Sequence, residues 1–208
     1  MDIFDRFYSE ITQTVFSLQK FGETSFELNK SSLHGLVGIS IQDTRTLLVG
    51  MQNILANYLK KPRIELNLSI PENIESNNDF LSAMKSVHRY FFISILTSLD
   101  AAAERICKES FHIKLKGEHA FIKALSKLKS QEQSKWKSFY DGLKIIRNEC
   151  AHPSLSDPHE KQIEKLTNAG LGFLVFEGKF SISCSKYLPI SEKAYECVSA
   201  LKTIKIAP

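Results

Sequence analysis

The sequence has no uninterrupted apolar run close to the roughly 18 residues that a membrane-spanning helix needs. Its opening segment, MDIFDRFYSE, contains acids where a signal peptide has a basic start followed by an apolar core. Internal repeats and low-complexity tracts are also absent. With 208 residues, 43% of them hydrophobic and 24% charged, the chain has the composition of a globular protein. We therefore expect a cytoplasmic protein that does not enter a membrane.

Cysteine is scarce, and its spacing excludes the common zinc and redox motifs. The four cysteines, Cys107, Cys150, Cys184 and Cys197, form no Cys-x-x-Cys pair. No cluster of His, Asp and Glu has the spacing of metal ligands either. We expect buried free thiols in a reducing compartment, and no metal or other cofactor.

Positive charge is concentrated in one part of the chain. The net charge is +4, yet residues 105–147 hold 11 Lys and Arg against 4 Asp and Glu. A helix over this region would place Lys116, Lys123 and Lys127 on one side. These lysines, together with Lys144, are candidates for binding the phosphates of a polyanion. A plain solvated lysine face explains the same pattern equally well.

Hydrophobic periodicity predicts a mainly α-helical protein. The longest predicted helix begins at Asn78 or Asp79 and carries one apolar face for nearly thirty residues, which requires a central position. That face consists of Phe80, Met84, Val87, Phe91, Ile95, Leu99, Ala102 and Ile106. Further helices are expected over 3–18, 43–59, 118–129, 131–151, 158–169 and 191–204.

Two regions have the pattern of β-structure. Residues 63–70 alternate apolar and polar side chains, which predicts a strand. Residues 173–176 and 180–184 flank Glu177-Gly178, which predicts a tight hairpin near 173–184. The hairpin could pair with the strand on the side of the bundle.

The polar segment PENIESNN, residues 71–78, is the best candidate for a domain boundary. It divides the chain into an N-terminal helical extension, 1–75, with one possible strand, and a main helical domain, 76–208. We expect the extension to pack on the main domain.

The segment LKIIRNECAHPS places a guanidinium, an amide and an imidazole within two helical turns, at Arg147, Asn148 and His152. Arg147 lies about 20° from Trp136 on a helical wheel, within an otherwise apolar stripe. A guanidinium there needs an acid, a second subunit or a ligand anion as its partner. An ion pair with Glu104 is one structural explanation.

His152 lies about 140° from Arg147 on an ideal helix. Because Pro153 disfavours helical geometry in the residue before it, the helix is expected to end beside His152, and the imidazole can then turn toward Arg147. Asp100 and Glu104, one turn apart on the long helix, are candidates for orienting this Arg or His. Ordinary exposed acids would have the same spacing.

Arginine and histidine together provide what RNA cleavage without a metal requires. An imidazole titrates near about pH 6.5 and can accept or donate a proton, and a guanidinium binds phosphate through a fork of N–H groups. The reaction would be attack by the 2′-hydroxyl, which leaves a 2′,3′-cyclic phosphate and a 5′-hydroxyl.

The Arg-Asn-x-x-Ala-His segment, at the end of an amphipathic helix that follows a long apolar helix, resembles the HEPN family (higher eukaryotes and prokaryotes nucleotide-binding), in the type with four to six residues between Arg and His. Many members are metal-independent endoribonucleases. The resemblance implies an antiparallel helical bundle, here with a small hairpin on its side, and a homodimer whose paired motifs line one cleft. It also implies that Arg147 holds the scissile phosphate, that His152 acts as acid or base and that Asn148 positions one of them.

Such proteins often act in toxin–antitoxin or anti-phage defence, which implies an antitoxin or regulatory partner. Some of the toxins carry a modified tyrosine two residues after the histidine, where this chain has Ser154. Two alternatives stay open. One is a catalytically silent HEPN-like module that binds a nucleotide or a protein. The other is a helical protein that binds nucleic acid through its lysines without cleaving it.

Overall fold

A computed structural model describes residues 3–25, 32–64, 77–151 and 158–204. The fold is mainly helical with a small two-stranded sheet, which confirms the predicted class. In chain order the elements are α1 (Ile3–Ser25), α2 (Leu33–Leu59), α3 (Asn77–Phe111), α4 (Gly117–Leu125), α5 (Ser130–Ala151), α6 (Glu160–Asn168), the 3-10 turn η1 (Gly172–Leu174), β1 (Val175–Phe176), β2 (Lys179–Phe180), the 3-10 turn η2 (Cys184–Lys186) and α7 (Tyr187–Lys202).

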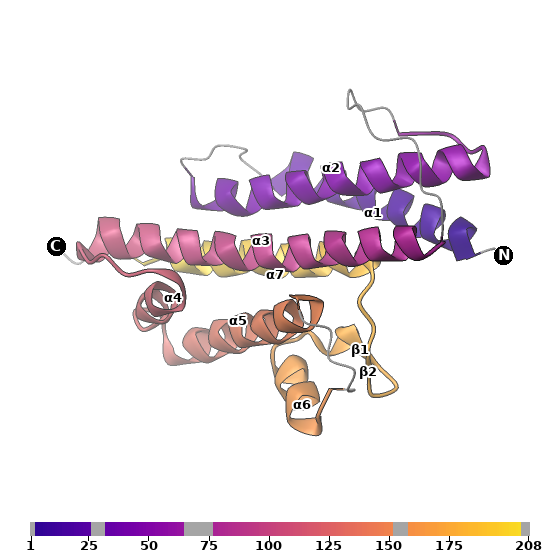
Figure 1. Cartoon of the computed structure of the whole chain (residues 1–208). Coiled ribbons are helices and arrows are strands. Elements are labelled where there is room, and N and C mark those ends of the chain that lie inside the picture. Colours follow the sequence, from indigo (N-terminus) through magenta and orange to yellow (C-terminus); the bar gives the residue numbers. More distant parts are fainter. Residues whose placement is uncertain (1–2, 26–31, 65–76, 152–157, 205–208) are drawn as a thin grey trace.

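The central element is α3, as its apolar face predicted. It has 35 residues and is therefore about 52 Å long. All eight residues of the predicted face are buried. Figure 1 shows α2 on one side of α3, α4 and α5 on the opposite side, and α7 alongside it, and each of these helices contacts α3. One continuous apolar core results, to which α1 also contributes.

The start of α2 differs from the prediction. The helix predicted over 43–59 begins at Leu33 instead, and the Ser32 hydroxyl accepts a hydrogen bond from the Gly35 backbone N–H at 2.9 Å. Gly35 and Gly38, which disfavour a helix by about 1 kcal/mol each, are buried inside it. Helix packing and the cap, which contributes about 1 kcal/mol, outweigh that propensity.

The predicted strand at 63–70 and the boundary at 71–78 lie mostly outside the described residues, which stop at Ile64 and resume at Asn77. The backbone N–H of Ile64 donates to the side-chain oxygens of Gln52 and Asn53, at 3.1 and 2.9 Å. The described start of this segment is therefore attached to α2, and Asn77 and Asn78 already belong to α3.

The hairpin forms where the sequence predicted it, with strands of two residues each. Glu177 and Gly178 have φ values of 48° and 75°, so both turn residues are left-handed, as a two-residue hairpin with matching twist requires. The following helix, α7, begins at Tyr187, four residues before the predicted start at Ser191. In the part of the chain that the structure describes, no helix is both long and apolar enough to cross a membrane.

We predict that Gly142→Ala lowers the free energy of unfolding. A Cβ at Gly142 would lie 2.7 Å from the Ala169 Cβ and 2.9 Å from the Leu171 Cδ1, so α5 and the end of α6 would have to separate. Overpacking of this kind costs about 1–3 kcal/mol, and the better helix propensity of alanine offsets about 1 kcal/mol of it. Urea unfolding measures the change. The control is Ser134→Ala, at an exposed position of the same helix. An unchanged or higher stability of Gly142→Ala would contradict the packing described here.

Candidate functional site

One face of α5 carries polar groups where it meets α3 and α4. Tyr140, Lys144 and Arg147 follow each other at spacings of four and three residues, so they lie on the same side of the helix. Beside them, the side chains of the apolar stripe are buried against the core: Trp136, Phe139, Leu143 and Ile146. The three polar residues therefore lie along the edge of a buried surface.

Tyr140 connects the three helices. Its hydroxyl donates to Asp100 Oδ1 of α3 at 2.6 Å, and its ring stacks on Phe121 of α4 with centroids 4.2 Å apart. The ring is 3% exposed. Burial and the hydrogen bond to Asp100 raise the pKa of Tyr140 far above its ordinary value, so the phenol stays protonated and remains a donor.

Asp100 has an acidic neighbourhood. Burial is the main cause that raises its pKa, and Glu104 and Glu118 raise it further. The hydrogen bond from Tyr140 and the positive charge of Arg147 act in the opposite direction. Of the two acids proposed to orient the arginine or histidine, Asp100 is the one whose pKa Arg147 lowers.

Glu104 forms a contact that the sequence did not predict. Its Oε1 accepts the backbone N–H of Gly117 at 2.7 Å, which attaches the first residue of α4 to α3. Gly117 adopts φ +53°, a left-handed conformation suited to glycine, and a Cβ there would lie 3.9 Å from Asp100 Oδ2. Within the described residues, Glu104 forms no ion pair with Arg147.

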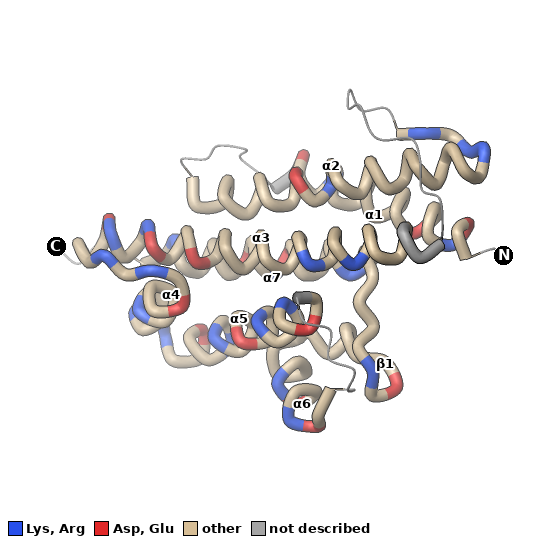
Figure 2. The backbone as a smooth tube through the Cα atoms, viewed as in Figure 1, with Lys and Arg blue, Asp and Glu red and all other residues tan. Residues whose placement is uncertain are grey.

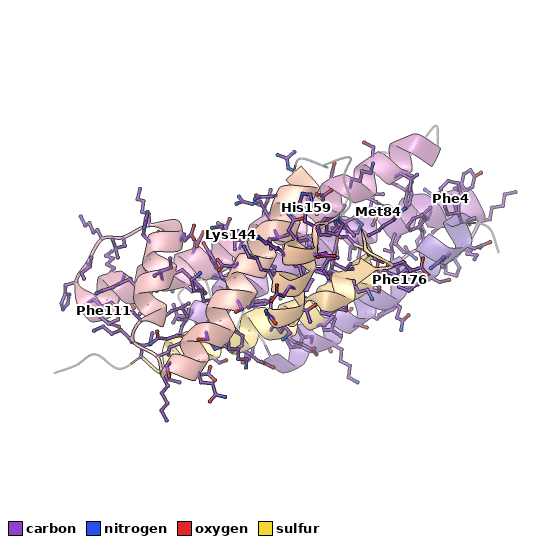
Figure 3. The ribbon with its side chains drawn as sticks, turned by 90° about the horizontal axis from the view of Figure 1, so that it is seen from below. Phe4, Met84, Phe111, Lys144, His159 and Phe176 are labelled. Atoms are coloured by element: carbon purple, nitrogen blue, oxygen red, sulfur yellow. The ribbon has the colours of Figure 1, made fainter. Side chains whose placement is uncertain are left out.

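Lys144 is engaged by an acid. Its Nζ lies 2.6 Å from Glu118 Oε2, and both side chains are partly exposed. The ammonium group also lies 5.9 Å from the centre of the Tyr140 ring. In Figure 3, Lys144 is labelled on the α5 ribbon. Because Glu118 balances its charge, Lys144 is a weaker candidate for a phosphate contact than its sequence position suggested.

Arg147 has an unused donor. Its Nε is buried and, among the described residues, has no hydrogen-bond acceptor. The guanidinium is close enough to Asp100 and Tyr140 to lower the pKa of both groups, yet it forms no ion pair within 4.0 Å in the described ranges. A buried donor without an acceptor costs about 1–3 kcal/mol, so an anion that reached this Nε would be bound favourably.

Of the other two motif residues, the structure describes Asn148 and not His152. Asn148 is exposed on α5, directly after Arg147. α5 is helical as far as Ala151. His152 lies outside the described residues, as do Pro153 and Ser154.

The prediction that one helix carries Lys116, Lys123 and Lys127 on one side was wrong. α4 ends at Leu125 instead of near Lys129, so Lys123 alone of the three stripe lysines lies within the helix. Lys116 is its extended N-cap, and Lys127 follows the helix in a turn, with its Nζ 5.6 Å from the centre of the Phe111 ring. These lysines therefore do not form one helical face, although blue segments cluster around α4 in Figure 2.

The last turn of α5 lies near a second polar pair, which sequence analysis missed. His88 Nδ1 of α3 lies 2.6 Å from the hydroxyl of Tyr187 of α7. Burial lowers the pKa of His88 to about 4, although Glu10 opposes the shift, so this imidazole is neutral at physiological pH. Burial also raises the pKa of Tyr187, and Cys150 adds to that shift. Because His88 and Tyr187 are 99 positions apart in the sequence, no local pattern could have paired them.

The cysteines are all free, as predicted: Cys107, Cys184 and Cys197 are buried and Cys150 is partly buried. The described residues contain no group of three or more His, Cys, Asp or Glu arranged to hold a metal ion.

Comparison with protein-family models, with curated proteins and with solved structures finds no match. The residues around Arg147 are therefore the basis for proposing a function.

We predict that Asp100→Asn gains stability relative to the wild type as the pH rises. A raised carboxyl pKa means that the folded state binds this proton more tightly than the unfolded state does, so the wild type loses stability as Asp100 ionises above about pH 4. Asparagine can still accept the Tyr140 hydrogen bond but does not ionise. Urea unfolding between pH 4 and pH 7.5 measures the difference, with Glu164→Gln, an exposed acid on α6, as the control. A difference between Asp100→Asn and wild type that does not change with pH would contradict the raised pKa.

Proposed function

We propose that this protein is a metal-independent endoribonuclease of the HEPN type. The observation that supports the proposal is the buried Nε of Arg147, which has no acceptor among the described residues and belongs to the Arg-Asn-x-x-Ala-His segment. A phosphate oxygen is a suitable acceptor because guanidinium groups bind phosphate through paired N–H donors. Arg147 thus has both the charge and the free donor that a scissile phosphate requires.

In the proposed reaction the 2′-hydroxyl of RNA attacks the adjacent phosphorus, and the bond to the 5′-oxygen breaks. One base removes the 2′-hydroxyl proton, one acid protonates the leaving 5′-oxygen, and Arg147 stabilises the charge on the phosphoryl oxygens. His152 supplies the acid or base, and Asn148 positions the ring or the phosphate. Tyr140 and Asp100 act on Arg147 indirectly, because their hydrogen bond fixes the acid beside the guanidinium.

One chain supplies one motif histidine, whereas the reaction uses an acid and a base. We therefore propose a homodimer in which two copies of the motif line one cleft. A role in toxin–antitoxin or anti-phage defence, with an antitoxin or regulatory protein as partner, follows from the family resemblance.

A catalytically silent HEPN-like module is the second candidate, and one observation favours it. Glu104, Glu118 and Arg147 all act on the pKa of Asp100, and Glu118 pairs with Lys144, so three acids and two basic groups share this part of the site. An acidic neighbourhood opposes RNA binding.

We predict that the wild type cleaves 3′-labelled RNA in EDTA and that Arg147→Ala and His152→Ala each lower the rate by about 100-fold or more, as loss of a transition-state donor or of the acid–base group does. The matched control is Arg89→Ala, which removes an exposed arginine from α3 and should retain the wild-type rate. Arg147→Lys keeps the charge but loses the fork, and should stay impaired.

A substrate with 2′-deoxy residues at the cleavage sites should remain intact, and the products should carry 2′,3′-cyclic phosphate. Cleavage of the deoxy substrate, or equal rates for Arg147→Ala and Arg89→Ala, would overturn the proposal. Correctly folded proteins that all leave the RNA intact would favour the silent module.

A further inference from the structure

A cavity of about 710 Å³ lies at the end of the bundle, away from Arg147. It is formed by the last turn of α3, the turn between α4 and α5, the first turn of α5 and the end of α7. Phe111, Leu128 and Ile204 provide apolar walls, and Lys127 and Lys129 line the cavity as well. Figure 3 labels Phe111 at one end of the molecule and Phe4 at the other. The volume is within the range of about 300–1,000 Å³ that is typical of small-ligand sites.

The position of Phe111 is fixed by the way α3 ends. His112 adopts φ 54°, and the backbone N–H of Ile113 donates to the Cys107 carbonyl at 3.0 Å, a C-terminal capping arrangement. Phe111 is therefore the last helical residue, and its half-buried ring borders the cavity. Lys127 Nζ lies 5.6 Å from the centre of this ring.

The turn that carries the two lysines is also braced. The Gln133 side-chain amide donates to the Leu128 carbonyl at 2.6 Å. Glu132, the acid of the cavity, accepts a hydrogen bond from Trp136 Nε1 at 2.6 Å. One carboxylate oxygen of Glu132 is therefore engaged by α5 itself.

Lys127 and Lys129 differ from the lysines of α5. Lys135, Lys137 and Lys144 each form an ion pair with an acid. Lys127 and Lys129 are exposed and, within the described ranges, lie more than 4.0 Å from any carboxylate. Their positive charge is therefore available to an anionic ligand. An apolar ligand alone would leave this charge unused.

We propose that this cavity binds a nucleotide, with the base against Phe111 and the phosphate at Lys127 and Lys129. Aromatic side chains bind bases by stacking, and lysines contact the backbone phosphates. We favour a nucleotide within a single RNA strand, and that choice of source rests on the proposed ribonuclease function. From Phe111, such a strand would run about 16 Å along α3 to reach Asp100 and Arg147. The cavity would then hold the substrate strand at a distance from the cleavage site.

The test measures binding of a fluorescent 2′-O-methyl RNA oligomer to Arg147→Ala protein, so that neither the probe nor the protein permits cleavage. Phe111→Leu keeps the apolar filling but removes the stacking surface, and should weaken binding about tenfold. The double substitution Lys127→Ala, Lys129→Ala should also weaken binding about tenfold. The slope of log affinity against log salt concentration should become shallower by the equivalent of about two phosphate contacts. The matched control, Lys135→Ala with Lys137→Ala, removes the same charge from acid-paired positions and should change affinity less than twofold.

Adenosine 5′-monophosphate serves as a second probe and separates the two sources of the ligand. Phe111-dependent binding of the oligomer alone identifies an RNA strand, and Phe111-dependent binding of the mononucleotide as well identifies a site for free nucleotides. If Phe111→Leu binds both probes with an affinity within twofold of that of the Arg147→Ala protein in which it is made, the proposal is overturned. Equal losses in the two double-lysine variants would do so too, because they would indicate a general charge effect. These results do not depend on activity, so a failure of the ribonuclease proposal is a separate outcome.

Discussion

The hydrogen bond from Tyr140 to Asp100 determines how α5 lies on α3 and what Arg147 can bind. It places a phenol between two helices and uses one oxygen of Asp100, whose pKa the guanidinium of Arg147 lowers. Phe121 of α4 stacks on the same phenol, and Glu104 attaches the start of α4 to α3. α3, α4 and α5 are thus joined by polar contacts that leave the Nε of Arg147 without an acceptor among the described residues.

Elements with strong periodicity were predictable from sequence, because burial on one face imposes that pattern. The apolar face of α3, the extent of α5 and the turn at Glu177-Gly178 all follow from side-chain size and backbone preference. The start of α2 was missed because local propensity counts Gly35 and Gly38 against a helix, while tertiary packing buries them inside one.

The candidate site was only partly predictable. Arg147 was identified because a guanidinium in an apolar stripe needs a partner. The role of Tyr140 was not predicted, because its hydroxyl, which reaches Asp100, has no periodic signal. The prediction of a helical lysine face was wrong because α4 ends at Leu125, before Lys127. The spacing of Tyr140, Lys144 and Arg147 along one face of α5 could have indicated the cluster.

We propose that the Nε–H of Arg147 donates to a phosphate oxygen of RNA. NMR of protein labelled with 15N-arginine tests it directly, with the Arg147 signal assigned by its loss in Arg147→Lys. On addition of uncleavable 2′-O-methyl RNA, we expect that signal to shift and its hydrogen exchange with water to slow. An Arg147 signal that stays unchanged at saturating RNA, while other arginine signals move, would contradict the account.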